Sequence, residues 1–163
     1  LDFETSGVVV FSKNKDVEKI ILDSKFKGWR KIYRTLVMGR IMKSKGVLRM
    51  PLPARGKGKV EAVTNYNVLD RFANSSYIEA EIETGRYHQI RRHFAAINHP
   101  LVLDSVYGHA KFNSLFTREL HFRQFFLHAS SLSLPHPITG EVVHIEAPLP
   151  RPFEQLIKRL KSI

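Results

Sequence analysis

The sequence contains no cysteine among its 163 residues. This absence excludes disulfides, thiolate zinc sites, iron–sulfur clusters and cysteine nucleophiles, and it is typical of proteins from a reducing compartment. Long apolar runs are also missing, since the run 7–11 is far shorter than the roughly 20 residues that a membrane-spanning helix needs. We therefore expect a cytoplasmic protein with neither a membrane span nor a secretory leader.

Acidic residues are absent from one long segment. Between Lys25 and Lys59 there are twelve basic residues and no Asp or Glu, and the whole chain carries 26 Lys and Arg against 15 Asp and Glu, a net charge of +11. This excess of positive charge creates an electrostatic field that attracts polyanions, and it favours a nucleic-acid partner. A solvated basic loop or a nonspecific polyanion patch has the same composition, and composition does not distinguish RNA from DNA.

Composition and patterning indicate one α+β domain over residues 1–163. Hydrophobic residues make up 43% and charged residues 25%, the balance of a globular protein. β-rich or alternating stretches predict strands over 7–11, 31–37, 60–69, 77–82, 125–134 and 141–147. Helical spacing predicts helices over 16–22, 87–97 and 153–163, and the prolines and glycines at 51–58 predict a long basic loop that forms no packed element. This mixture favours a mixed, mainly antiparallel sheet with a few flanking helices.

Several familiar catalytic motifs are missing. His88 and His93 are five residues apart and do not share a helix face, so no H-E-x-x-H zinc pair is present. The glycines at 56 and 58 lack the length and the strand-to-helix setting of a phosphate-binding loop, and no G-x-S-x-G elbow occurs. The sequence therefore supports neither metal-dependent, nucleotide nor serine hydrolysis.

The segment 83–93 places two arginines on one predicted helix. At about 100° per residue the apolar stripe centres between Ile90 and Phe94, Arg92 points away from it, and Arg91 borders it. We expect Arg91 to be half-buried and to require an acid partner, because a desolvated guanidinium is costly when unpaired. A structural salt bridge meets that requirement as well as a catalytic pair does.

Two further residues are ambiguous when taken singly. Asp2 precedes a short polar turn, where an aspartate most often caps the turn. Tyr33 has the position of a half-buried strand aromatic, but its basic neighbours Arg30, Lys31 and Arg34 also suit a base-stacking platform on RNA.

Four motifs that contain these residues follow one another along the chain. They are Leu-Asp-x-x-Thr-Ser-Gly at 1–7, Lys-x-Tyr-x-x-x-Val-x-Gly at 31–39, Thr-Gly-Arg-x-His-Gln-Ile-Arg at 84–91, and His99-Pro100. Asp104 with Tyr107-Gly108, and a closing block over 127–148, continue the pattern. In this order the motifs resemble the RluA family of RNA pseudouridine synthases over essentially the whole chain.

The resemblance implies the pseudouridine synthase catalytic fold, a monomer, and isomerisation of a flipped-out uridine without metal or organic cofactor. It implies that Asp2 is the essential carboxylate, that Arg91 pairs with Asp2, and that Tyr33 stacks on the target base. We further expect RNA contacts from Lys31, Arg86, His88, Arg30 and Arg34. Ribosomal RNA is the favoured substrate, because the acid-free segment suits a large structured target, and transfer RNA is the alternative.

The chain also departs from the family pattern. The family's first motif reads His-Arg-Leu-Asp, and the chain begins at Leu1, so we expect a catalytic domain that is incomplete at its N-terminus. Tyr87 stands where Thr or Ser is common and Arg92 where Val is common, changes expected to alter RNA choice more readily than chemistry. Two alternatives to an active enzyme stay open: a noncatalytic RNA-binding module, and an inactive fragment of the enzyme.

Overall fold

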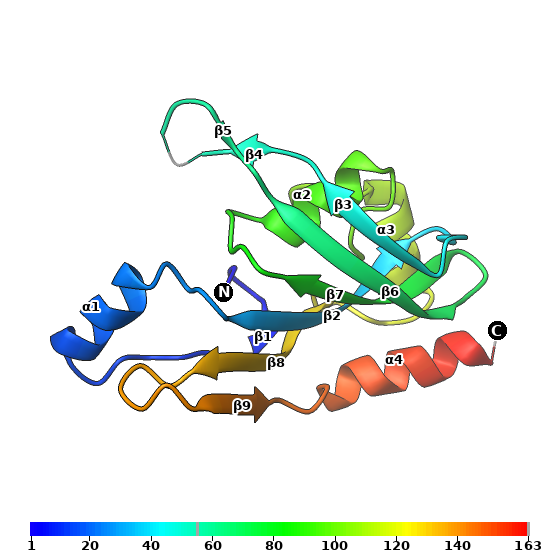
Figure 1. Cartoon of the computed structure of the whole chain (residues 1–163). Helices are drawn as coiled ribbons and strands as arrows, with labels where there is room; N and C mark the ends of the chain where they lie inside the picture. Colours follow the sequence, from blue (N-terminus) through cyan, green and yellow to red (C-terminus); the bar gives the residue numbers. More distant parts are fainter. Residues whose placement is uncertain (55, 163) are drawn as a thin grey trace.

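The protein forms a central, mainly antiparallel sheet with helices on both faces, which confirms the α+β prediction. The computed structural model describes residues 1–54 and 56–162 (Figure 1). Its elements are β1 (Ser6–Gly7), α1 (Lys15–Asp23), β2 (Arg30–Met38), β3 (Lys45–Arg49), β4 (Leu52–Pro53), β5 (Lys59–Val60), β6 (Val63–Arg71), β7 (Ser75–Ile82), α2 (Gln89–Ala96), α3 (Ala110–Arg118), β8 (Leu127–Pro135), β9 (Val142–Glu146) and α4 (Arg151–Lys161).

The strands of the large sheet lie in the order β1-β8-β2-β7-β6-β3, and β9 pairs with β8 beside β1. β1 runs parallel to β8 and the other pairs are antiparallel. The strands predicted over 60–69 and 77–82 correspond to β6 and β7, which pair with each other as a hairpin. None of the helices in the described part of the chain is long and apolar enough to cross a membrane.

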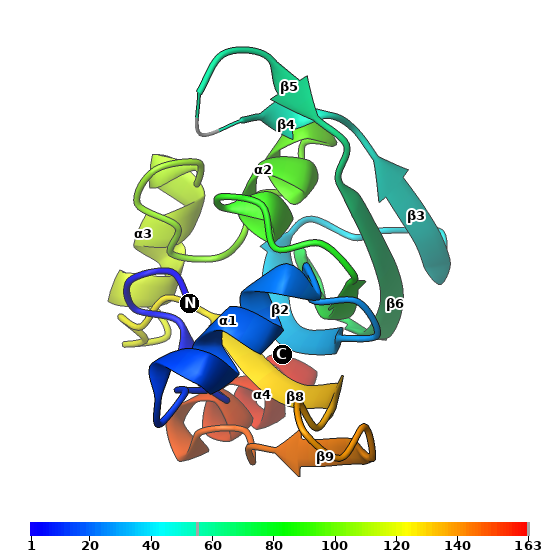
Figure 2. The ribbon, with the colours of Figure 1, turned by 60° about the vertical axis from the view of Figure 1, so that its left-hand side comes forward.

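Two apolar cores occupy the two faces of the sheet. One packs Ile90 and Phe94 of α2 against β2, β6 and β7, and the other gathers aromatic side chains from α3, the 122–126 segment and α4 around Leu36 of β2. Figure 2 shows α2 and α4 on opposite sides of the sheet. Because side chains alternate along β2, Tyr33 faces the α2 side and Leu36 faces the α4 side.

Three predicted elements differ from the structure. Of the strand predicted over 7–11, only Gly7 pairs with β8, together with the preceding Ser6. The following residues line a pocket, and Phe11 is 84% exposed. The predicted helix over 87–97 begins at Gln89, because His88 has the left-handed φ of +53° and turns the chain away from helical geometry. Tyr87 is therefore outside the helix and exposed rather than part of its apolar face.

The expectation of a long basic loop without a packed element was wrong. Leu52 and Pro53 of β4 pair with Lys59 and Val60 of β5, and Leu52 is buried. Before this segment, Lys45–Arg49 pairs with β6 as β3, where no strand was predicted. A proline is tolerated in such a short ladder where its missing N–H is not needed, which explains Pro53 in β4. No element was predicted over 110–118, where α3 buries only Phe116 and so leaves a weak periodic signal.

Candidate active site

Arg91 is the centre of a buried ion-pair cluster at the start of α2. Only 6% of the residue is exposed, so it is more deeply buried than its place beside the apolar stripe predicted. Its Nε and Nη2 donate to the two carboxylate oxygens of Asp104 at 2.7 and 2.8 Å. Its Nη1 lies 3.6 Å from Oδ2 of Asp2. The required acid is present, but it is Asp104 that forms the close bidentate pair. Asp2 is the more distant of the two acids that face Arg91.

Asp104 is held in place by several donors. Its Oδ1 also accepts the backbone N–H groups of Val106 and Tyr107 at 2.8 and 2.9 Å. Burial by itself raises the pKa of the Asp104 carboxyl, but the hydrogen bonds from Arg91 and the two backbone amides outweigh burial and hold that pKa below its ordinary value. Asp104 therefore stays charged and fixes the orientation of the guanidinium that faces Asp2.

The turn that carries Asp2 is anchored to β8. The Thr5 amide donates to the carbonyl of Asp2 at 3.1 Å, and Ser6 Oγ lies 2.9 Å from Nδ1 of the buried His128. Gly7 has a φ of +109°, and a Cβ there would clash with the carbonyl oxygen of Ala129. This close approach requires glycine. The Asp2 side chain remains 23% exposed, so a substrate can reach it.

Tyr33 lies near Asp2 on the α2 face of the sheet. Burial, together with the negative charge of Asp2, raises the pKa of the Tyr33 phenol to about 12. Its ring lines a pocket of about 540 Å³ that extends along residues 8–12 to α1 and includes Leu1 and Lys31. The phenol is therefore neutral at physiological pH, and the ring offers an apolar surface beside a carboxylate.

The structure brings two of the five residues predicted to contact RNA, Lys31 and His88, near Tyr33 or Asp2. Lys31 lines the same pocket as Tyr33, and burial lowers the pKa of its ammonium group. His88 lies close enough to Asp2 for the negative charge of Asp2 to act on its imidazole, and its Nδ1 is 3.1 Å from the hydroxyl of Tyr107. Arg86 lies on the exposed turn before α2, and its Nε donates to the carbonyl of Glu61 at 3.3 Å.

The structure does not bring Arg30 and Arg34 to this site. Arg30 forms a bidentate pair with Glu81 at 2.8 Å, and Arg34 pairs with Glu79 at 2.8 Å. Because side chains alternate along β2, Arg34 faces away from Tyr33, beside Tyr77 and Ile32. Any RNA contact by these two arginines is therefore separate from the cluster around Asp2.

Sequence reasoning missed two residues that organise the site. Asp104 was noted in the motif but not recognised as the partner of Arg91, because the contact spans a loop whose path the sequence does not give. Gln89 is buried and braces the turn before α2: its Oε1 accepts from Thr84 Oγ1 and the Arg86 amide, and its Nε2 donates to the Val63 carbonyl. For Gln89, the signal available in the sequence was a polar residue on the apolar face of a predicted helix.

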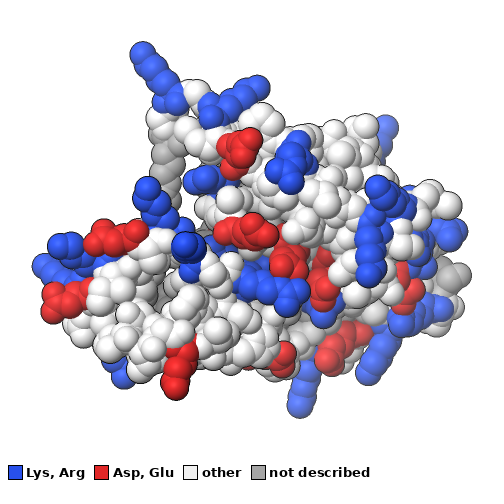
Figure 3. All heavy atoms as spheres, in the orientation of Figure 1, with Lys and Arg blue, Asp and Glu red and all other residues white. Residues whose placement is uncertain are grey.

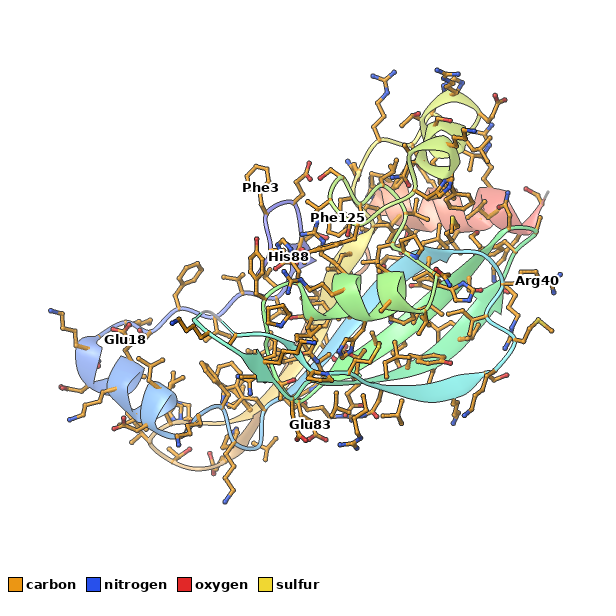
Figure 4. The ribbon with its side chains drawn as sticks, turned by 90° about the horizontal axis from the view of Figure 1, so that it is seen from above. Phe3, Glu18, Arg40, Glu83, His88 and Phe125 are labelled. Atoms are coloured by element: carbon orange, nitrogen blue, oxygen red, sulfur yellow. The ribbon has the colours of Figure 1, made fainter. Side chains whose placement is uncertain are left out.

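Asp2, Arg91 and His88 lie close enough together for their charges to interact. In Figure 4, His88 is labelled near Phe3, the residue after Asp2. The guanidinium of Arg91 lies over the Phe125 ring at 5.0 Å from its centroid. The cluster thus combines an accessible carboxylate, a fixed buried cation and an aromatic ring.

Comparisons with known proteins point to one family. Residues 1–96 match the family model described as RNA pseudouridylate synthase. The chain is 33% identical over 172 residues to an uncharacterized RNA pseudouridine synthase of Chloroflexus aurantiacus, covering 99% of this chain and 52% of that protein. It is also 36% identical over 177 residues to the ribosomal large subunit pseudouridine synthase D of Neisseria meningitidis, covering 99% of this chain and 47% of that protein.

Solved structures share the fold. Human RNA pseudouridylate synthase domain containing 4 aligns with a TM-score of 0.80 at 24% identity, covering 99% of this chain and 74% of that one. Human RNA pseudouridylate synthase domain containing 1 aligns with a TM-score of 0.73 at 23% identity, covering 100% and 78%. The chain spans about half the length of the curated relatives it matches. On the matched family model and the ordered motifs, the chain belongs to the RNA pseudouridine synthases of the RluA family.

Proposed function

We propose that this protein is an RNA pseudouridine synthase in which Asp2 is the catalytic carboxylate. The observation that carries the proposal is an accessible Asp2 carboxylate 3.6 Å from the buried Arg91 guanidinium and close enough to Tyr33 for its charge to act on the phenol. A turn-capping aspartate does not need a buried cation, so the geometry favours a chemical role over the purely structural one.

The proposed reaction is an isomerisation. The bond between N1 of uracil and C1′ of ribose breaks, the base rotates, a bond forms between C5 and C1′, and the C5 proton is lost while N1 gains one. Asp2 either attacks C1′ or removes the 2′ proton, and both routes need its carboxylate ionised and placed against the sugar. Arg91 stabilises that anion, and Asp104 orients Arg91.

Tyr33 is proposed to stack on the extruded uracil. Base extrusion costs a few kcal/mol, part of which stacking on an aromatic ring offsets. With a phenol pKa of about 12, Tyr33 assists removal of the C5 proton through its hydroxyl as a hydrogen-bonding group rather than as a phenolate.

We propose structured RNA, and ribosomal RNA in particular, as the substrate. Several relatives are named ribosomal large subunit pseudouridine synthase D, which supports this choice over transfer RNA. The net charge of +11 and the acid-free segment supply an electrostatic attraction to the phosphate backbone. Figure 3 shows Lys and Arg side chains on the hairpin that projects from the body of the protein.

The central test compares Asp2→Asn with the wild type in the full-length protein. We expect Asp2→Asn to abolish pseudouridine formation while RNA affinity stays within about three-fold, because Asn keeps the size and loses the charge that both routes require. Asp23→Asn, an exposed change at the end of α1, is the matched control. An equal loss of activity and affinity in Asp2→Asn contradicts the catalytic assignment.

The substrate is identified by mass-spectrometric mapping of pseudouridine in total RNA from cells with and without the full-length gene. Loss of a site in ribosomal RNA supports the proposed substrate, and loss of a site in transfer RNA replaces it. An unchanged map, together with retained RNA binding by the purified protein, favours a noncatalytic RNA-binding module instead.

A further inference from the structure

An aromatic and cationic cluster adjoins the proposed active site, and two of its residues, Tyr87 and Arg92, stand where the chain departs from its family's pattern. The Tyr87 and His88 rings stack, with centroids 3.7 Å apart and 22° between their planes. Arg92 lies over the Tyr87 ring at 5.4 Å and over the Tyr107 ring at 5.6 Å. These four residues are called the Tyr87 platform below.

Hydrogen bonds fix the platform. Arg92 Nε donates to the hydroxyl of Tyr107 at 2.8 Å, and that hydroxyl lies 3.1 Å from Nδ1 of His88. With the Tyr107 hydroxyl as the donor to Nδ1, the neutral His88 imidazole carries its proton on Nε2. Within residues 1–54 and 56–162 no hydrogen bond to Nε2 is present, which leaves this nitrogen available to a ligand.

The backbone at the platform is also constrained. His88 has a left-handed φ of +53° without a side-chain cap, a conformation that a residue with a Cβ keeps only where its surroundings enforce it. Gln89 supplies that enforcement by binding the preceding turn and β6. The residue Tyr87 is 59% exposed although the His88 ring stacks on its ring.

The platform adjoins the carboxylate of Asp2. The charge of Asp2 acts on His88, and Arg91, which pairs with Asp2, lies over the Tyr107 ring at 5.3 Å. In Figure 4, His88 is labelled near Phe3, the residue after Asp2. Tyr87 is exposed and contacts a second ring and a guanidinium, an arrangement that core packing does not need. It suits stacking on an unpaired nucleobase, because every base has a flat π-face.

We propose that the Tyr87 platform binds a second, unpaired nucleobase of the RNA, one that flanks the target uridine. Tyr87 stacks on this base, Arg92 adds its positive charge, and His88 Nε2 donates a hydrogen bond to the base or its phosphate. The platform thereby selects uridines that lie in unpaired loops. This inference rests on the proposed function, because it takes the uridine at Asp2 as the reference point.

The test uses the full-length protein and a single-stranded oligouridylate that carries 2-aminopurine beside its central uridine. Wild type is compared with Tyr87→Ala and Tyr87→Phe, and Val142→Ala, an exposed apolar change on β9, is the control. We expect Tyr87→Ala to weaken binding by roughly ten-fold or more, the size of one base–aromatic stack, and to abolish quenching of the 2-aminopurine fluorescence. Tyr87→Phe and the control should retain the RNA affinity and the quenching within about two-fold.

A second measurement separates this inference from the proposed function. On the RNA whose modified site has been mapped, Tyr87→Ala should raise KM and leave kcat nearly unchanged, because Tyr87 does not touch the reacting atoms. Conversion by the wild type with an unchanged KM and unchanged quenching in Tyr87→Ala overturns the platform alone. Absence of conversion by the wild type overturns the proposed function, whatever Tyr87 contributes to binding.

Discussion

Arg91 and Asp104 show how a buried charge is made stable. The two side chains are almost fully buried, and their fork-to-fork contact satisfies two guanidinium donors and both carboxylate oxygens. A buried ion pair adds little net stability when complete, but breaking it leaves a desolvated charge without its counterpart. The pair is therefore more important for positioning Arg91 than for holding the fold together.

We predict that Asp104→Asn lowers the free energy of unfolding by about 3–5 kcal/mol, because Arg91 then loses its close carboxylate. Urea denaturation followed by circular dichroism measures this change. Glu81→Gln, which breaks the more exposed pair with Arg30, is the matched control and should cost less than about 1 kcal/mol. Similar losses of unfolding free energy in the two variants contradict the view that Arg91 is a buried cation that depends on Asp104 as its counterion.

Among the elements, β1 is short but decides where Asp2 lies. It consists of Ser6 and Gly7, and its register with His128 and Ala129 of β8 sets the end of the turn that carries Asp2. The close approach at Gly7 leaves no room for a side chain. A change at this position acts on the active site through the backbone.

We predict that Gly7→Ala lowers stability and reduces pseudouridine formation strongly, because both the left-handed φ and the clash with Ala129 oppose a Cβ. Gly140→Ala is a matched control, since Gly140 also has a positive φ, +76°, but nothing lies within 4 Å of an added Cβ. Backbone strain alone costs about 1–3 kcal/mol. Thermal unfolding and activity should therefore fall further in Gly7→Ala than in Gly140→Ala, and equal effects would show that the close packing is unimportant.

His93 joins three elements through one imidazole. It is fully buried on α2, its Nδ1 lies 2.9 Å from Thr64 Oγ1 of β6, and its Nε2 lies 3.0 Å from the carbonyl of Met50, just before β4. The carbonyl can only accept, so Nε2 donates, and in the neutral ring Nδ1 accepts from the threonine hydroxyl. Burial favours this neutral ring, and the two contacts tie the segment before β4 to the helix.

Stability is predicted to fall as the pH drops below the ordinary histidine pKa of about 6.5. Burial lowers the pKa of His93 in the folded protein, so the unfolded chain binds the proton more readily, and the stabilisation present above about pH 6.5 is lost as the pH falls through the folded pKa. Nitrogen-15 NMR of the imidazoles follows His93 directly. An NMR titration of His93 at or above about 6.5 contradicts this prediction.

At the scale of the whole molecule, the uneven charge should govern RNA binding. The hairpin carries Lys57 and Lys59 on a projecting element, whereas the exposed Lys158 lies on α4, across the sheet from α2. Each phosphate contact adds about 0.7–0.9 to the slope of the logarithm of affinity against the logarithm of salt concentration. Only lysines that reach the RNA contribute.

We predict that the double variant Lys57→Ala with Lys59→Ala reduces this salt slope by roughly one or more, while Lys158→Ala leaves it unchanged. Fluorescence anisotropy of a labelled RNA at several salt concentrations gives the slope. A larger effect of Lys158→Ala than of the hairpin variant means that the RNA binds the α4 face instead.

The sequence by itself determined the family, most of the strands and the need of Arg91 for an acid, because motifs, alternation and amphipathic spacing are local patterns. Strand alternation also placed Tyr33 and Arg34 on opposite faces, but the sequence could not give the partner of Arg91 or the pairing of Leu52–Pro53 with Lys59–Val60. Those features depend on how loops return and which strands become neighbours. Only the tertiary structure decided that Asp104 holds Arg91 toward Asp2, since contacts between distant residues leave no periodic trace in the chain.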